Sequence, residues 1–211
     1  GVTAQLGLAM MEREAFGETW DDPAWLHVQI EAKKRAFSIR DQYLGDPREM
    51  PVAVDSILSP ATVDAIWADF DPGHATPGQA TMAGDTVYLA VIDANGLAVS
   101  LIQSIYSGFG SGLIAGDTGI LLQNRGSYFS LIPGHPNELG GGRLPLHTLM
   151  PAMIDMPGRG RGAFGTQGGD VQAQVHMQIV SHLVDDGATP EEAIGRPRWI
   201  SGDARLDPYA V

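Results

Sequence analysis

Residues 86–106, TVYLAVIDANGLAVSLIQSIY, contain the clearest secondary-structure signal in the chain. Residues 86–93 and 97–106 are both rich in the β-branched and aromatic side chains that favour strands. Asn95-Gly96 lies between them and is typical of a two-residue hairpin turn, because both residues tolerate positive φ angles. The stretch therefore predicts an antiparallel hairpin whose first strand begins at Thr86.

The segment before this hairpin has a different composition. Residues 71–84 (DPGHATPGQATMAG) hold two prolines, three glycines and no apolar pattern. Such a composition predicts an exposed, flexible linker. The linker leads through Asp85 directly onto the strand that starts with Thr86.

Helices are expected on the N-terminal side of the linker. Apolar residues at helical spacing predict one helix over Val2–Glu14. Asp22-Pro23 and Ser59-Pro60 each combine a capping side chain with a proline in the first turn, so two more helices should begin there.

Glycine-rich loops, short strands and two helices are expected after the hairpin. We predict strands around 120–122, 148–156 and 162–165, and a loop over 131–146. A helix over 171–186 should end at Gly187, and Thr189-Pro190-Glu191-Glu192 should cap a further short helix.

Composition excludes several classes of function. The 211 residues carry 13 Lys+Arg against 25 Asp+Glu, a net charge of −12, which argues against nucleic-acid binding and against a polybasic membrane anchor. The absence of cysteine excludes disulfides and thiolate chemistry but leaves the compartment open, cytoplasmic or periplasmic. No run of apolar residues is long enough to span a bilayer, and no signal peptide is evident.

Three short segments could carry chemistry. Thr86 could be an N-terminal nucleophile if the chain is cut before it, because its freed α-amine, with a reference pKa of about 7.7–8.0, can serve as its own general base. Residues 165–170 (GTQGGD) precede a helix and could present backbone N–H groups to an anion. His147-Thr148 follows a polar loop. The structural alternatives are an ordinary hairpin entry for Thr86, a tight turn for 165–170 and a polar loop for His147-Thr148.

Cofactors are not expected. The phosphate-binding patterns GxxxxGK[ST] and GxGxxG are absent, and the histidines lack the spacing of a metal site.

Taken together, these segments resemble the gamma-glutamyltransferase family. The likeness runs without a gap from Thr86 to Phe129 and continues through PLHTLMP at 145–151, GTQGG at 165–169 and RPRW at 196–199. Upstream, AKKRAFSIRDQYLGDP at 32–47 is similar to the end of that family's large subunit. The resemblance covers nearly the whole chain, and its specificity lies in the combination of these motifs.

The resemblance implies an α+β fold, the four-layer αββα sandwich of N-terminal nucleophile hydrolases. It implies self-cleavage before Thr86, with 1–85 as the C-terminal part of a large subunit and 86–211 as the N-terminal part of a small one. Thr86 would form the acyl-enzyme with a small amide substrate, Ser104 would support it, and Gly168 and Gly169 would hold the oxyanion. The chain resembles the middle of a longer precursor.

Several residues depart from the family's pattern for recognising a glutamyl group. Tyr106 replaces an asparagine, Arg125 and Tyr128 replace a glutamine and an aspartate, and His147-Thr148 replaces a pair of serines. These differences favour the branch that includes oxamate amidohydrolase and some cephalosporin acylases. A true gamma-glutamyltransferase or glutathione hydrolase, and a catalytically silent binding or structural relative, remain the alternatives.

Overall fold

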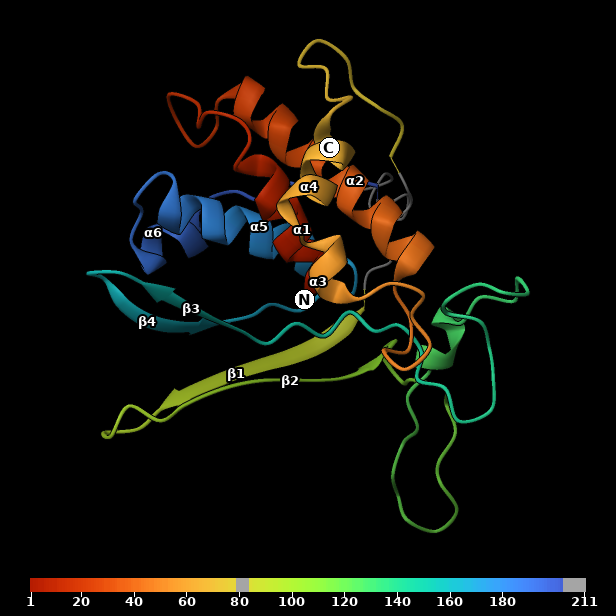
Figure 1. The fold of residues 1–211 in the computed structure, drawn as a ribbon. Helices are drawn as coiled ribbons and strands as arrows, with labels where there is room; N and C mark the ends of the chain where they lie inside the picture. The colour runs from red at the N-terminus through yellow and green to blue at the C-terminus, as the bar shows by residue number, and fades with distance from the viewer. Residues whose placement is uncertain (79–83, 203–211) are drawn as a thin grey trace. The chain divides into compact units, whose positions relative to one another are not determined.

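The computed structural model describes residues 1–78 and 84–202. Within them, contacts divide the chain into two compact units. We call the one formed by Gly1, 45–49 and 84–172 the strand unit, and the one formed by 2–44, 50–78 and 173–202 the helical unit. The elements, shown in Figure 1, are α1 (Val2–Met11), α2 (Pro23–Tyr43), α3 (Val54–Ile57), α4 (Pro60–Trp67), β1 (Asp85–Ile92), β2 (Ala98–Tyr106), the 3-10 turn η1 (Arg125–Tyr128), β3 (Ala152–Met156), β4 (Gly160–Phe164), α5 (Val171–Val184) and α6 (Pro190–Gly195).

The helix starts follow the capping signals of the sequence. The Asp22 carboxylate accepts the N–H of Ala24 at 2.8 Å at the start of α2. Ser59 caps α4, and Thr189 forms a complete capping box with Glu192 at α6. These three predicted helix starts are confirmed, because each side chain satisfies an N–H that the helix leaves unpaired.

The core of the helical unit lies where α1 meets α2 and α5. Met10 and Phe37 are fully buried, and so is Met177 of α5. Gly7 allows the close approach, since a Cβ atom there would lie 2.5 Å from the Met177 sulfur. The long helix predicted from 171 ends at Val184, and Gly187 follows it with a φ of 70°.

The strand unit contains two antiparallel hairpins. β1 pairs with β2, so the predicted hairpin is confirmed, but its turn is longer than two residues: Ile92 pairs with Ala98, and Gly96 has a φ of 83° while Asn95 does not have a positive φ. β3 pairs with β4, and β4 also contacts both strands of the first hairpin. The second hairpin begins at Ala152 and not at Thr148, because Pro151 has no N–H to donate to a strand partner.

The strand predicted around 120–122 is wrong. The structure has only an isolated bridge between Ile114 and Leu121. Leu122 donates its N–H to Leu113 at 2.8 Å, so this loop pairs with itself, and Ile120 is 61% exposed. A β-favouring run without a neighbouring strand does not form a sheet.

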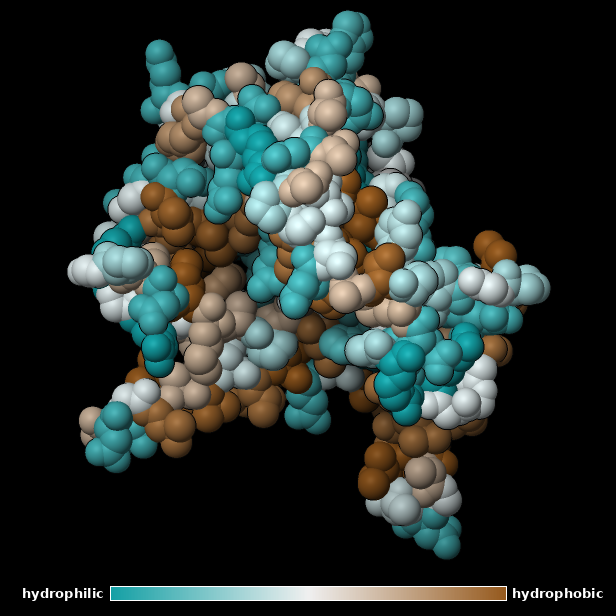
Figure 2. Space-filling view, in the orientation of Figure 1, coloured by the Kyte–Doolittle hydropathy of each residue, from teal (hydrophilic) through white to brown (hydrophobic). Residues whose placement is uncertain are grey.

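One face of the first hairpin is apolar and exposed. Leu89 lies opposite Leu101 and Val91 lies opposite Val99, and all four side chains are at least 41% exposed. Figure 2 shows hydrophobic side chains gathered along this hairpin. In the described residues, no helix combines the length and apolar character needed to cross a membrane.

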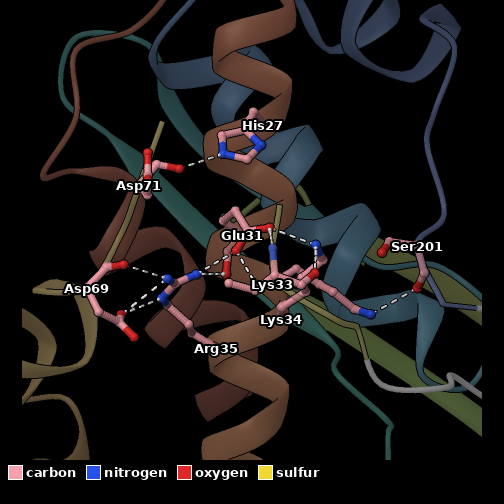
Figure 3. A network of polar contacts seen from close by, with 9 residues as sticks. His27, Glu31, Lys33, Lys34, Arg35, Asp69, Asp71 and Ser201 are labelled. Carbon is pink, nitrogen blue, oxygen red and sulfur yellow. Dashed lines mark hydrogen bonds and ion pairs between the residues drawn. The ribbon is translucent and has the colours of Figure 1, made fainter. Parts of the chain in front are cut away.

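A buried carboxylate holds part of the predicted linker in the helical unit. Glu31, 1% exposed on α2, accepts hydrogen bonds from Lys34 at 2.7 Å and from Arg35 at 2.7 Å (Figure 3). It also accepts the N–H of Thr76 at 3.0 Å and its hydroxyl at 2.6 Å. Residues 71–78 are exposed as expected, but Thr76 is fixed at its backbone and its side chain. Residues 79–83 of the linker lie outside the described residues.

We expect Glu31→Gln to remove the acid sensitivity that this cluster confers. Burial would raise the pKa of Glu31, but hydrogen bonds from Lys34, Thr76 and Arg35 outweigh it and lower the pKa to about 2. A depressed pKa gives stability above the unfolded value of about 4.3 that is lost as the pH falls towards 2, on the order of 3 kcal/mol. Urea unfolding from pH 2 to 7 should show this loss in the wild type and in the surface control Asp155→Asn, and a flatter profile in Glu31→Gln. Equal slopes in all three proteins would contradict it.

Candidate active site

Thr86 lies at an irregularity in the first hairpin. Asp85 pairs with Tyr106 and Val87 pairs with Gln103, so two residues of β2, Ser104 and Ile105, lie opposite Thr86 alone. Thr86 is 9% exposed, and its hydroxyl oxygen is buried with no hydrogen-bond partner in the described part of the chain. Buried hydroxyls are normally paired, and bulges often re-aim side chains at active sites. The hydroxyl is therefore available for chemistry.

Ser104 joins the peptide before Thr86 to the end of β2. Its hydroxyl donates to the carbonyl oxygen of Asp85 at 2.7 Å and accepts the N–H of Tyr106 at 2.9 Å. The carbonyl of the Asp85–Thr86 peptide is thus polarised by a hydrogen bond. The predicted pair of Thr86 and Ser104 lies together across the hairpin.

Tyr106 has a strained backbone. Its φ of 78° makes it the one non-glycine residue with positive φ among those described. An L-residue there costs about 1–2 kcal/mol, and such strain is found mainly where function requires it. The side chain is 2% exposed, and its hydroxyl also lacks a hydrogen-bond partner within the described residues.

Tyr106, Tyr128 and Arg125 form a cluster. The two tyrosine rings lie 5.0 Å apart, and the Arg125 guanidinium lies 5.5 Å from the Tyr106 ring. Arg125 also reaches the hydroxyl of buried Thr148 with a long contact of 3.5 Å. Four of the residues that differ from the glutamyl-binding pattern are therefore brought together.

Arg125 is a buried cation without a carboxylate. The residue is 4% exposed, its Nη2 has no hydrogen-bond partner, and no ion pair to it is found in the described residues. Burial lowers the pKa of Arg125, yet guanidinium stays charged at neutral pH. Burying an unpaired charge is costly, so an anionic ligand at Nη2 would relieve that cost.

His147 stands beside this cluster and is exposed. Partial removal of its imidazole from water, and secondly the Arg125 cation, lower the pKa of His147. Both effects favour the neutral form of the ring. In that form it can offer a hydrogen bond but not a second positive charge.

Gly168 and Gly169 form the turn before α5. Their φ angles are 114° and 58°, and the first is a conformation that side chains with a Cβ rarely adopt. The loop approaches β1 closely, since a Cβ atom on Gly165 would lie 2.4 Å from the Tyr88 ring. No hydrogen bond joins Thr86 to either glycine in the described part of the chain. That their backbone N–H groups hold an oxyanion stays a prediction.

Asp170 ends the segment 165–170 but is not among the residues predicted to contact the substrate. It is 3% exposed and accepts a hydrogen bond from the Tyr128 hydroxyl at 3.3 Å. Its position directly after the glycine pair could have indicated a role in the site. An aspartate at that position is, however, equally typical of the start of a helix. The described residues contain no group of three or more His, Asp or Glu that could hold a metal ion.

A buried, unpaired threonine hydroxyl at a strand start, beside a polarised peptide carbonyl, is the arrangement expected of N-terminal nucleophile hydrolases. The family model for gamma-glutamyltranspeptidase matches residues 1–206. The chain therefore belongs to the gamma-glutamyltranspeptidase family, and the resemblance drawn from its motifs is confirmed.

Individual relatives agree with this membership. The chain is 42% identical to the oxamate amidohydrolase proenzyme of Klebsiella pneumoniae over 86% of its length, and 42% identical to the glutathione hydrolase-like YwrD proenzyme of Bacillus subtilis over 96%. It also resembles the crystal structure of cephalosporin acylase from Bacillus halodurans, with a TM-score of 0.80, 36% identity and 95% of the chain covered. The chain spans 35%, 39% and 37% of these three proteins, respectively.

Proposed function

We propose that this chain carries the catalytic junction of a self-cleaving N-terminal nucleophile amidohydrolase, with cleavage between Asp85 and Thr86. The observation that carries the proposal is that the buried Thr86 hydroxyl has no hydrogen-bond partner in the described residues, while the adjacent Asp85 carbonyl is polarised by Ser104. The relatives named proenzymes support maturation from a precursor. Residues 1–85 and 86–211 would then belong to a large and a small subunit.

The cleavage would proceed as an N→O acyl shift. The Thr86 oxygen attacks the Asp85 carbonyl carbon, the C–N bond breaks, and the Thr86 nitrogen takes the proton to become a free amine. Water then hydrolyses the resulting ester and releases the Asp85 carboxylate. The hydrogen bond from Ser104 would stabilise the negative charge that develops on the Asp85 oxygen.

The mature enzyme would use the same hydroxyl on a small amide. The new α-amine of Thr86 accepts the hydroxyl proton, and the hydroxyl forms an ester with the acyl part of the substrate. Backbone N–H groups of Gly168 and Gly169 would hold the tetrahedral oxyanion. Water then releases the acid; no cofactor is needed for any of these steps.

The fold proposed for the whole protein is the four-layer αββα sandwich. Its support is the exposed apolar face of the first hairpin, formed by Leu89, Val91, Val99 and Leu101. Monomeric proteins rarely leave such a face uncovered. A further layer of the longer protein would cover it, in keeping with the fraction of each relative that the chain spans.

The cluster of Tyr106, Arg125, Tyr128 and Thr148 would favour an acyl group with a carboxylate and without an ammonium. Arg125 offers an unpaired, buried Nη2 to a carboxylate, and Tyr128 puts a neutral phenol where the family's pattern has an aspartate. Binding an ammonium against a phenol forfeits a charge-assisted hydrogen bond, about 1.5–3 kcal/mol. Oxamate and glutaryl-type amides meet this description.

Paired kinetics on the mature full-length enzyme test the proposal. We expect kcat/KM for a glutaryl anilide to exceed that for the gamma-glutamyl anilide by about 10–100-fold. Arg125→Leu should lower kcat/KM for both anilides, because both carry the carboxylate that loses its cation, and Arg161→Leu, which changes an exposed arginine, should leave both values near those of the wild type.

A true gamma-glutamyltransferase is the second candidate, and Asp170 is the observation that favours it. Its buried carboxylate accepts a hydrogen bond from the Tyr128 hydroxyl. The carboxylate could replace the missing aspartate as the partner of a substrate ammonium. A tenfold preference for the gamma-glutamyl anilide would establish this candidate. If a folded, cleaved protein turns over neither anilide, the remaining alternative is a catalytically silent binding or structural relative.

A further inference from the structure

Asp46, in the turn after α2, has a buried carboxylate with a full set of donors. The residue is 2% exposed, and its Oδ2 accepts the backbone N–H of Leu144 at 2.8 Å. Its Oδ1 accepts the backbone N–H of Arg48 at 3.0 Å and the Nε of the same arginine at 2.9 Å. Hydrogen bonds from the Arg48 side chain and from these two N–H groups hold the pKa of Asp46 far below its usual range. The carboxylate is therefore ionised at any assay pH.

The neighbours of Asp46 contact the same partner segment. Arg48 Nη2 donates to the carbonyl of Gly142 at 2.8 Å. A Cβ atom on Gly45 would lie 2.5 Å from the carbonyl oxygen of Pro136, so only glycine fits there. Residues 45–49 thus lie against both ends of the segment 136–144, within the strand unit. We call residues 45–48 the clamp.

The clamped segment leads directly to the substrate-binding candidates. Two residues after Leu144, Leu146 donates its N–H to the Asn137 side chain at 2.9 Å. Asn137, 4% exposed, donates in turn to the carbonyl of Tyr128 at 2.6 Å. The bonds therefore run from Asp46 to the turn that carries Arg125 and Tyr128, and to His147-Thr148, which follows Leu146 in sequence.

We propose that Asp46 is a positioning residue that fixes the substrate-binding segment from the other side of the cleavage point. This rests on the proposed function, because cleavage before Thr86 would put Asp46 and Leu144 on different polypeptides. The clamp would then act between subunits, with no covalent connection between Asp85 and Thr86. Its loss should loosen Tyr128 and His147-Thr148 and leave the Thr86–Ser104 pair in place.

The expected signature of this role is a split between binding and chemistry. Asp46→Ala in the full-length precursor should be cleaved like the wild type. Its KM for the glutaryl anilide should rise at least tenfold, while kcat falls less than threefold. The KM of Asp46→Asn should lie between those of the wild type and Asp46→Ala, because its amide oxygen can still accept the Leu144 N–H. Asp155→Asn, which removes an exposed carboxylate of the same unit, is the matched control and should match the wild type.

Amide hydrogen exchange gives a readout that needs no turnover. Exchange in the segment 136–148 should be at least tenfold faster in Asp46→Ala than in the Asp155→Asn control, and exchange in β1 should be unchanged. If Asp46→Ala does not fold, Arg48→Ala serves instead, because the Arg48 side chain is 63% exposed and its loss still removes the Gly142 contact.

The outcomes separate the two proposals. Faster exchange in 136–148 together with an uncut, inactive wild type would support the clamp and refute the proposed function. An active wild type with unchanged exchange and an unchanged KM in the folded variant would refute the clamp. A loss of thermal stability with neither change would assign Asp46 a structural role only, which also overturns the positioning role.

Discussion

Thr86→Ala is expected to leave the full-length precursor as a single polypeptide without amide hydrolase activity. The methyl side chain has no oxygen to attack the Asp85 carbonyl, so the acyl shift cannot begin. Neither an α-amine nor an acyl-enzyme can then form at this position, and the loss should be complete within detection. A denaturing gel of the incubated precursor and an anilide assay measure the two effects.

Thr86→Ser keeps the hydroxyl and should restore cleavage at a lower rate. Its side chain lacks the methyl group that restricts the χ1 angle of threonine, so the attacking oxygen is less well fixed. N-terminal sequencing of the smaller wild-type fragment should begin TVYLAV. Thr118→Ala, which removes an exposed hydroxyl bonded to the Ala115 carbonyl, is the matched control and should be cut normally. A different N-terminal sequence, or efficient cleavage of Thr86→Ala, would rule the mechanism out.

Local signals predicted most helix starts and the first hairpin. Asp22, Ser59 and Thr189 cap the helices they precede, and Gly96 adopts the positive φ that its turn requires. These features depend on interactions among neighbouring residues. The prediction of a strand around 120–122 was wrong because a strand must pair with another segment, and the local composition does not show whether such a segment lies beside it.

In the candidate site, local patterns indicate Thr86, the segment 165–170 and His147-Thr148, and the family resemblance adds the other site residues and the individual roles. The burial of the site's side chains and the hydrogen bonds between them depend on contacts between residues far apart in the sequence, so local patterns could not predict them. In the sequence Arg125 is an ordinary loop cation, and only its burial without a carboxylate supports the proposal that it binds an anion. The bond from Tyr128 to Asp170 spans 42 residues, and that from Asp46 to Leu144 spans 98.

Gly169→Val is expected to reduce turnover by about 10²–10³-fold while the protein remains folded and cleaved. Gly169 has a φ of 58°, which a β-branched residue adopts only with strain. The loop should relax and move its N–H groups away from the place where the oxyanion forms. Loss of one such donor costs about 10²–10³ in rate. Steady-state kinetics on the purified variant, with N-terminal sequencing to establish cleavage, measure the effect.

Gly187→Val is the control that separates strain from catalysis. Gly187 has a φ of 70°, with no atom within 4 Å of a Cβ placed there, and it follows α5 in the helical unit. Valine there imposes a similar backbone strain far from the glycine pair in sequence, so stability should fall while turnover per folded molecule stays near the wild-type value. If both variants lose turnover equally, strain alone explains the effect. If a folded, cleaved Gly169→Val protein turns over like the wild type, the glycine pair does not hold the oxyanion, and a different donor must be sought beside Thr86.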